Sequence, residues 1–213
     1  MTVRHTPEGD TASIGILSFA QALEKEASAE DYDVTKWIYL PSSYGEYRYV
    51  LGTRGEKPLF CIGVNPSTAA PGRLDPTLKS VERVALGNGY DSFLMFNLYA
   101  QRATDPSDME RAFNGLLHTY NVEAFSYMLS LCKEPPDVWA AWGTLVEKRD
   151  YLPGCVRAFA DAAVPFGARW FTFGARSKSG HPHHPLYLKK DCAPEPFDVF
   201  AYLEGLKGRE VSP

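Results

Sequence analysis

The chain has 213 residues, of which 45% are apolar and 13% are aromatic, and this composition predicts one compact globular domain. Its formal charge of -4 excludes a protein held to nucleic acid by a broad basic surface. No apolar run approaches the roughly 20 residues that cross a bilayer, and the first residues lack the basic start and apolar block of a signal peptide. We therefore expect a cytoplasmic, monomeric protein with no membrane partner.

The first part of the chain predicts a helix, two short strands, and then a core strand with its own helix. Residues 14 to 30 have helical spacing, and "WIYLPSSYGEYRYVLG" reads as two strands around a turn. The segment "PLFCIGV" is short and continuously apolar, as is typical of a central strand that is covered on both faces. A helix is expected from Asp75, because Asp75 can cap it and Pro76 suits its first position.

The same alternation continues to the end of the chain. "SFLMFNL" is the next expected strand, and Asp105-Pro106 after it predicts the start of helices that run to about Lys133. "DVWAAWG" and "ARWFTFG" are two further core strands, separated by a helix over about 144 to 163, and a last helix is expected near 198 to 206. Alternating strands and helices predict an α/β fold, a three-layer α/β/α sandwich with a mostly parallel central sheet.

Polar segments follow four of these strands at the point where each strand ends. They are Asn65 with "PST", Asn97, Trp142-Gly143, and the loop "SGHPHHPLYLKK" at 179 to 190. Because ligands bind beyond the carboxyl ends of strands in open α/β sheets, these segments predict one shared site. The required geometry is a common cavity for Asn65, Asn97 and a histidine of the loop.

Each of these features also has a purely structural interpretation. Asn65 precedes a proline and can simply end a strand, Asn97 can cap local backbone, and Asp75 can be no more than a helix cap. The basic residues between 169 and 190 can form a solvated loop. A zinc site at His181 and its neighbours is not expected, because a proline interrupts them and the four cysteines lie far apart. We expect no metal and no cofactor.

The order of these segments resembles that of the uracil-DNA glycosylase superfamily, with a GxNP motif, a strand ending in Asn, and a His-Pro loop followed by Leu. More closely, "YRYVLG", "NPSTA", "DPT", "NLYAQRATDP", "AWG" and "GHPHHPLYL" resemble an uncharacterised bacterial and phage domain of unknown function, over about 44 to 190. We expect a single domain over 1 to 213, in which the resemblance implies a glycosylase-like core over 44 to 206. Residues 1 to 43 fall outside the resemblance and are expected to form an N-terminal helical extension. The occurrence of the resembled domain in phages implies a role in phage defence.

The glycosylase resemblance implies an enzyme that flips uracil or a modified base out of DNA and hydrolyses its N-glycosidic bond. It implies that Asn65 orients the water and that His184, or His181 on the alternative pairing, stabilises the leaving base, with Asp75 as an additional carboxylate. The residues implied to contact the base are Gly63, Pro66, Ser67, Phe96, Asn97 and Tyr99. The residues implied to contact DNA are Ser177, Lys178, Ser179, Leu186, Lys189 and Lys190, with Leu186 as an apolar wedge.

The sequence departs from the superfamily at two points. An amide at Asn65 can orient water but cannot take its proton, as in the slower, Asn-bearing glycosylases. The His-Pro-x-Pro-Leu spacing is one residue too long from His181, and the ending "HPLYL" favours His184. The alternatives are a non-catalytic nucleotide-binding or nucleic-acid-binding module, an enzyme on free nucleosides or nucleotides, and an interaction domain unrelated to nucleotides.

Overall fold

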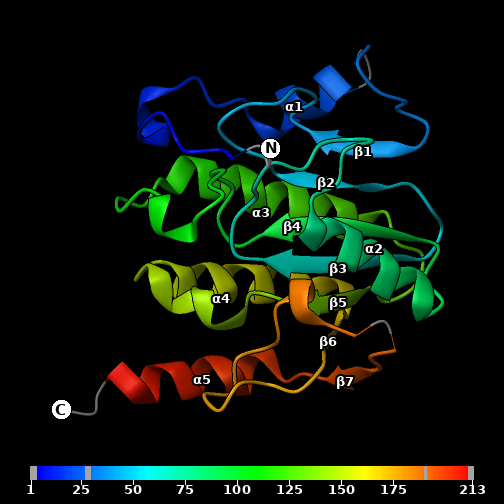
Figure 1. The fold of residues 1–213 in the computed structure, drawn as a ribbon, viewed down its shortest axis with the longest axis vertical. Coiled ribbons are helices and arrows are strands. Elements are labelled where there is room, and N and C mark those ends of the chain that lie inside the picture. Colours follow the sequence, from blue (N-terminus) through cyan, green and yellow to red (C-terminus); the bar gives the residue numbers. More distant parts are fainter. Residues whose placement is uncertain (1–3, 27–29, 190, 211–213) are drawn as a thin grey trace.

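The computed structural model describes residues 4 to 26, 30 to 189 and 191 to 210. They form one seven-stranded sheet in the order β1-β2-β4-β3-β5-β6-β7, covered by helices on both faces (Figure 1). The strands are β1 Trp37–Leu40, β2 Val50–Thr53, β3 Pro58–Gly63, β4 Ser92–Asn97, β5 Asp137–Ala140, β6 Arg169–Phe173 and β7 Pro194–Pro196. The predicted α/β sandwich is confirmed.

The sheet is mixed, with a parallel centre. β4, β3, β5 and β6 run parallel as neighbours, whereas β1, β2 and β7 pair antiparallel at the two sides. Almost every residue of β3 and β4 is buried, because helices cover both faces of the central strands. The continuous apolar runs of the sequence therefore correspond to the parallel strands, as expected.

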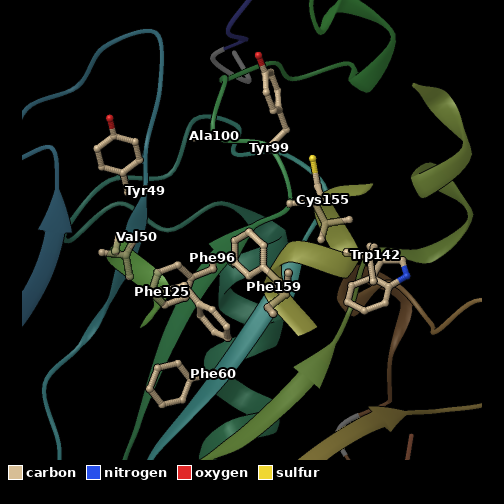
Figure 2. Packing of buried hydrophobic residues seen from close by; sticks show 14 of the residues in the cluster. Tyr49, Val50, Phe60, Phe96, Tyr99, Ala100, Phe125, Trp142, Cys155 and Phe159 are labelled. Atoms are coloured by element: carbon tan, nitrogen blue, oxygen red, sulfur yellow. The ribbon is translucent and has the colours of Figure 1, made fainter. Parts of the chain in front are cut away.

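The helices divide into two layers. They are α1 Phe19–Glu26, α2 Pro76–Gly87, α3 Gly115–Ser130, α4 Leu152–Ala163 and α5 Val199–Glu210. α3 contacts α1 and α4, and α4 contacts α5, so these four cover one face, while α2 packs on the other face against β3 and β4. Alternate residues of each strand enter the two cores. Phe60 packs with Phe96 and Phe125 on the four-helix side (Figure 2), and Cys61 belongs to the second core, together with Leu78 and Val81 of α2.

Helix α2 begins as its sequence predicts. The Asp75 carboxylate accepts a hydrogen bond from the Leu78 N–H at 2.9 Å, and Pro76 occupies the first turn. By contrast, Asp105 and Pro106 open only the short 3-10 helix η2 (Pro106–Asp108), and the long helix α3 begins at Asn114. The short helix ends because Met109 leaves the helical conformation at φ -57° and ψ 143°, and the Arg149 guanidinium then donates to the carbonyl oxygens of this segment.

Two other predicted helices are shorter than expected. α1 covers only part of 14 to 30, since the hydroxyls of Tyr47 and Tyr49 bind the N–H and the C=O of Leu17, and residues 27 to 29 lie outside the described part. The helix expected over 144 to 163 is divided into the 3-10 helix η3 (Gly143–Lys148) and α4. Strand β7 was not predicted, because "PEP" carries no strand signal.

The segment before residue 44 is joined to the sheet. β1 lies within the predicted helical extension and pairs antiparallel with β2, with Leu40 opposite Val50. Farther upstream, the backbone of His5 makes two hydrogen bonds of 2.8 Å to Thr104, one to its hydroxyl and one from its N–H. The predicted boundary at residue 44 therefore falls in the connection between two strands of the same sheet.

Candidate functional site

The chain leaves β3 and β4 toward opposite faces of the sheet, and this creates a crevice at their carboxyl ends. β3 is followed by α2 on one face, and β4 is followed by α3 on the other. Such a reversal is where α/β sheets bind ligands. A cavity of about 370 Å³ lies there, and its wall includes Arg48, Asn65, Asp75, Asn97 and His184. The sequence-predicted edge thus carries a cavity of the size of a small ligand.

Asn65 is held in one orientation by its own amide group. Its Nδ2 donates to the carbonyl oxygen of Ala103 at 2.7 Å and to that of Pro66 at 3.1 Å. Both hydrogens of the amide are used in this way, so Oδ1 is the atom that Asn65 can offer to a ligand or a water. The loop is fixed as well, because the Ala103 N–H donates to the Pro66 carbonyl at 2.9 Å.

Asn97 offers the opposite chemistry. Its side chain is buried, and its Oδ1 accepts a hydrogen bond of 3.1 Å from Nη2 of Arg48. A guanidinium has no acceptor, so the oxygen of the amide must face Arg48 and Nδ2 is left for a ligand. The backbone is anchored too, since Nδ2 of Asn121 donates to the Asn97 carbonyl at 2.7 Å. The cavity therefore presents a fixed acceptor at Asn65 and a fixed donor at Asn97.

Gly63 leaves the space in which Asn97 lies. A Cβ atom at this position would be 2.7 Å from Cε of Met95 and 2.9 Å from Nδ2 of Asn97, both inside van der Waals contact. We expect Gly63→Ala to lower the free energy of unfolding by about 1–3 kcal/mol, measured by urea titration, because the buried amide cannot move without losing Arg48. Gly154→Ala is the control: it lies in α4, and its Cβ would meet nothing within 4 Å. Equal stability of the two variants would contradict the packing described.

His184 enters the cavity as a neutral imidazole. Burial lowers the pKa of His184, as does the charge of His183, and the Asp75 carboxylate acts in the opposite direction. Its Nδ1 accepts from the Leu186 N–H at 3.3 Å, so the neutral ring carries its proton on Nε2. Gly143 passes close by at φ +61°, with its Cβ position 3.5 Å from Cβ of His184. That distance is an ordinary van der Waals contact, so the left-handed backbone, and not a lack of space, explains the glycine of the Trp-Gly motif.

His181 has a different place. It is fully buried, it is absent from the cavity wall, and its ring lies 2.8 Å from the Tyr202 hydroxyl and 3.0 Å from a Glu147 carboxylate oxygen. Nε1 of Trp142 also donates to the Tyr202 hydroxyl, at 3.1 Å. These bonds tie the histidine loop to η3 and α5. Of the two candidate histidines, the structure places His184 on the cavity and His181 in a supporting network.

The other predicted site residues fall into three groups. Gly63, Pro66, Ser67, Asp75 and Leu186 line the cavity. Phe96 and Tyr99 do not: both are fully buried in the core, Phe96 against Phe125 and Tyr99 against Tyr151, so the expectation that either stacks on a base is wrong. Ser177, Lys178, Ser179 and Lys189 lie in the loops around the site without lining the cavity, and Lys190 is outside the described residues.

Two arginines of the site were missed at the sequence level. Arg48 and Arg102 are fully buried, and both donate to the carbonyl of Ala69, which belongs to the loop that follows β3. A sequence signal did exist, because Arg48 stands between two tyrosines in a strand-like apolar segment. A charged residue in such a position is rarely buried without a specific partner.

The fold and the cavity define an α/β protein with a cavity at the carboxyl edge of its sheet, into which polar side chains from several segments project. A family model described as "Protein of unknown function (DUF1643)" matches residues 48 to 186, and the chain belongs to this family. No curated protein and no solved structure matches the chain. The predicted membership of an uncharacterised family is thus confirmed, whereas nothing in these comparisons links the chain to the glycosylases.

Neither a membrane helix nor a metal cluster occurs in the part of the chain that the structure describes. None of its helices has the length and apolar character needed to cross a bilayer. Among the same residues, no group of three or more His, Cys, Asp or Glu side chains is placed to hold a metal ion.

Proposed function

We propose that the protein binds a nucleobase in this cavity and hydrolyses its N-glycosidic bond after the nucleotide has been flipped out of DNA. One observation carries the proposal: Asn65, Asn97 and His184, from three segments far apart in the sequence, line one cavity with complementary hydrogen-bonding atoms. Leu186 lies on the wall of the same cavity and is 39% exposed, as suits a residue that fills the space of a flipped base. A base presents carbonyl acceptors and N–H donors, which match this arrangement.

The reaction assigns a role to each side of the cavity. Oδ1 of Asn65 orients a water whose oxygen forms a bond to C1′ while the C1′–N bond breaks and its electron pair leaves with the base. Nδ2 of Asn97 and the neutral His184 donate to the oxygen on which negative charge develops. The proton of the water passes to Asp75, which supplies the carboxylate that an amide at position 65 lacks.

A second candidate function is recognition of a nucleobase without hydrolysis of its N-glycosidic bond. The net charge of -4 disfavours tight binding to duplex DNA, and the exposed Lys178 and Lys189 do not line the cavity. One oxygen of Asp75 is already engaged with the amino end of α2. These observations favour recognition of a base, or action on free nucleosides or nucleotides, over cleavage in duplex DNA.

The test is base release measured by mass spectrometry. Single-stranded and double-stranded oligonucleotides that carry uracil or modified pyrimidines are incubated with the full chain. We expect release that falls at least about 100-fold in Asn97→Ala and in His184→Ala, since each removes a donor to the leaving base. His183→Ala is the matched control, because His183 is in the same loop and does not line the cavity. Nucleotide binding without release of a base from any of these substrates would contradict hydrolysis and indicate that the protein recognises the nucleotide without cleaving it.

A further inference from the structure

The two buried arginines beside the cavity carry positive charge that no ion pair among the described residues neutralises. Arg48 and Arg102 have no exposed surface, and among the described residues neither forms an ion pair. Their guanidinium groups donate only to neutral acceptors, namely Asn97, Tyr39 and backbone carbonyls. The Nε atom of each is buried with no hydrogen-bond partner. Both residues are thus incompletely satisfied.

Such an arrangement is costly for the protein alone. A buried charge without a counter-ion costs several kcal/mol, and two like charges increase that cost. The pKa of Arg48 reflects this, because burial and the charge of Arg102 lower it to about 9, against a smaller opposing effect of Asp75. A bound anion would neutralise the charge and relieve both penalties.

The position of Arg48 shows where such an anion can bind. Arg48 is part of the cavity wall, together with Asp75, Pro76, Thr77 and Leu78 at the amino end of α2. Pro76 has no N–H, and the N–H groups of Leu78 and Lys79 are bonded to Asp75, so the Thr77 N–H and the helix dipole are what favour an anion there. Among the described residues of the cavity wall, Asp75 is the one carboxylate, and it faces the positive charges of two arginines: Arg48 on the wall, and Arg102, which shares the Ala69 carbonyl with it.

Hydroxyl groups complete this region. Ser67, Thr68, Thr77 and Thr104 all line the cavity, and a hydroxyl can donate to a phosphate oxygen. Arg48 and Asn97 both belong to the cavity wall, and the 3.1 Å hydrogen bond from Nη2 to Oδ1 joins them. Positive charge, a helix amino end and hydroxyl donors together match the chemistry of a phosphate group.

We propose that the cavity contains a phosphate subsite formed by Arg48 and the amino end of α2, so that its ligand is a nucleotide in preference to a free base or a nucleoside. This inference rests on the proposed function for the identity of the base. It adds that the phosphate, whether of a free nucleotide or of a DNA strand, supplies the missing counter-charge. Arg48 would then recognise the phosphate and Asn97 the base, and the hydrogen bond between these two side chains would connect the two parts of the site.

Calorimetry with the full chain tests the subsite with four probes: inorganic phosphate, deoxyuridine, deoxyuridine monophosphate and a short single-stranded oligonucleotide. We expect the monophosphate or the oligonucleotide to bind at least about tenfold more tightly than deoxyuridine, because the phosphate adds attraction to the buried positive charge of Arg48 in the cavity wall. Inorganic phosphate alone should raise the midpoint of thermal unfolding. A higher affinity for the oligonucleotide than for the monophosphate assigns the phosphate to DNA, and the reverse assigns it to free nucleotides.

Arg48→Met should abolish the preference for the phosphorylated ligand. Arg54→Met is the control, since Arg54 is paired with Glu26 and does not line this cavity. If Arg48→Met does not fold, the comparison of nucleoside with nucleotide in the native protein decides. Equal affinity for the two overturns the subsite, even where base release occurs. Tighter binding of the nucleotide than of the nucleoside, without base release, supports the phosphate subsite and contradicts the proposed hydrolase activity.

Discussion

Asn65→Asp is expected to destabilise the protein and to slow base release, although aspartate is the residue that could take a proton from water. The Nδ2 of Asn65 donates to two carbonyl oxygens, of Ala103 at 2.7 Å and of Pro66 at 3.1 Å. A carboxylate oxygen in the same place faces both acceptors with no hydrogen to share. We expect a loss of about 3 kcal/mol in the free energy of unfolding, from two lost hydrogen bonds and an uncompensated charge.

The pH dependence of the stability of Asn65→Asp separates the effect of the lost hydrogen bonds from the effect of the added charge. The carbonyl oxygens raise the pKa of the introduced carboxyl group in the folded state, so its penalty is small below its unfolded pKa of about 4 and grows as pH rises. Urea unfolding at pH 5 and pH 8 measures this, with Asn65→Ala as the comparison that removes the bonds without adding charge. Unchanged stability together with faster base release would contradict this geometry. It would mean that, in solution, the side chain at position 65 does not donate to the carbonyl oxygens of Ala103 and Pro66.

Glu110→Ala is the second change for which a large effect is expected, here on stability. The Glu110 carboxylate is buried and accepts from the Thr11 N–H and the Thr11 hydroxyl, both at 2.6 Å, and from the Tyr99 hydroxyl. Its removal leaves three buried donors without an acceptor. We expect the free energy of unfolding to fall by about 3–5 kcal/mol in urea titration.

The control for this change is Glu123→Ala, an exposed position on α3 that should alter stability by no more than about 0.5 kcal/mol. Equal midpoints for the two variants would mean that the Glu110 network is not formed in solution. The network also concerns the site, because the N-terminal segment that it anchors continues to His5, whose backbone holds Thr104 on the cavity wall. The segment before residue 44 therefore supports the cavity, a role that the sequence did not indicate.

Parallel topology made the location of the site predictable from sequence. Asn65 and Asn97 directly follow two continuous apolar runs, and parallel strands bring the residues at their carboxyl ends to one edge of the sheet. The order of short motifs then singled out the histidine loop. The stacking role of Phe96 and Tyr99 was wrong for two reasons. Phe96 is next to Asn97 on β4 and so faces the opposite side, into the core, whereas Tyr99 lies beyond β4, where its ring packs against Tyr151 and its hydroxyl donates to the buried Glu110.

The sequence by itself determined the features that depend on neighbouring residues: the buried strands, the capped start of α2, and the polar residues at the strand ends. Only the tertiary structure decided between His181 and His184, because the choice depends on Glu147 and Tyr202, which are 34 and 21 residues away along the chain. The same holds for Arg48, which meets its partner Asn97 49 residues later. Such contacts between distant segments leave no periodic pattern in the sequence, so only the folded chain shows which polar side chains share a cavity.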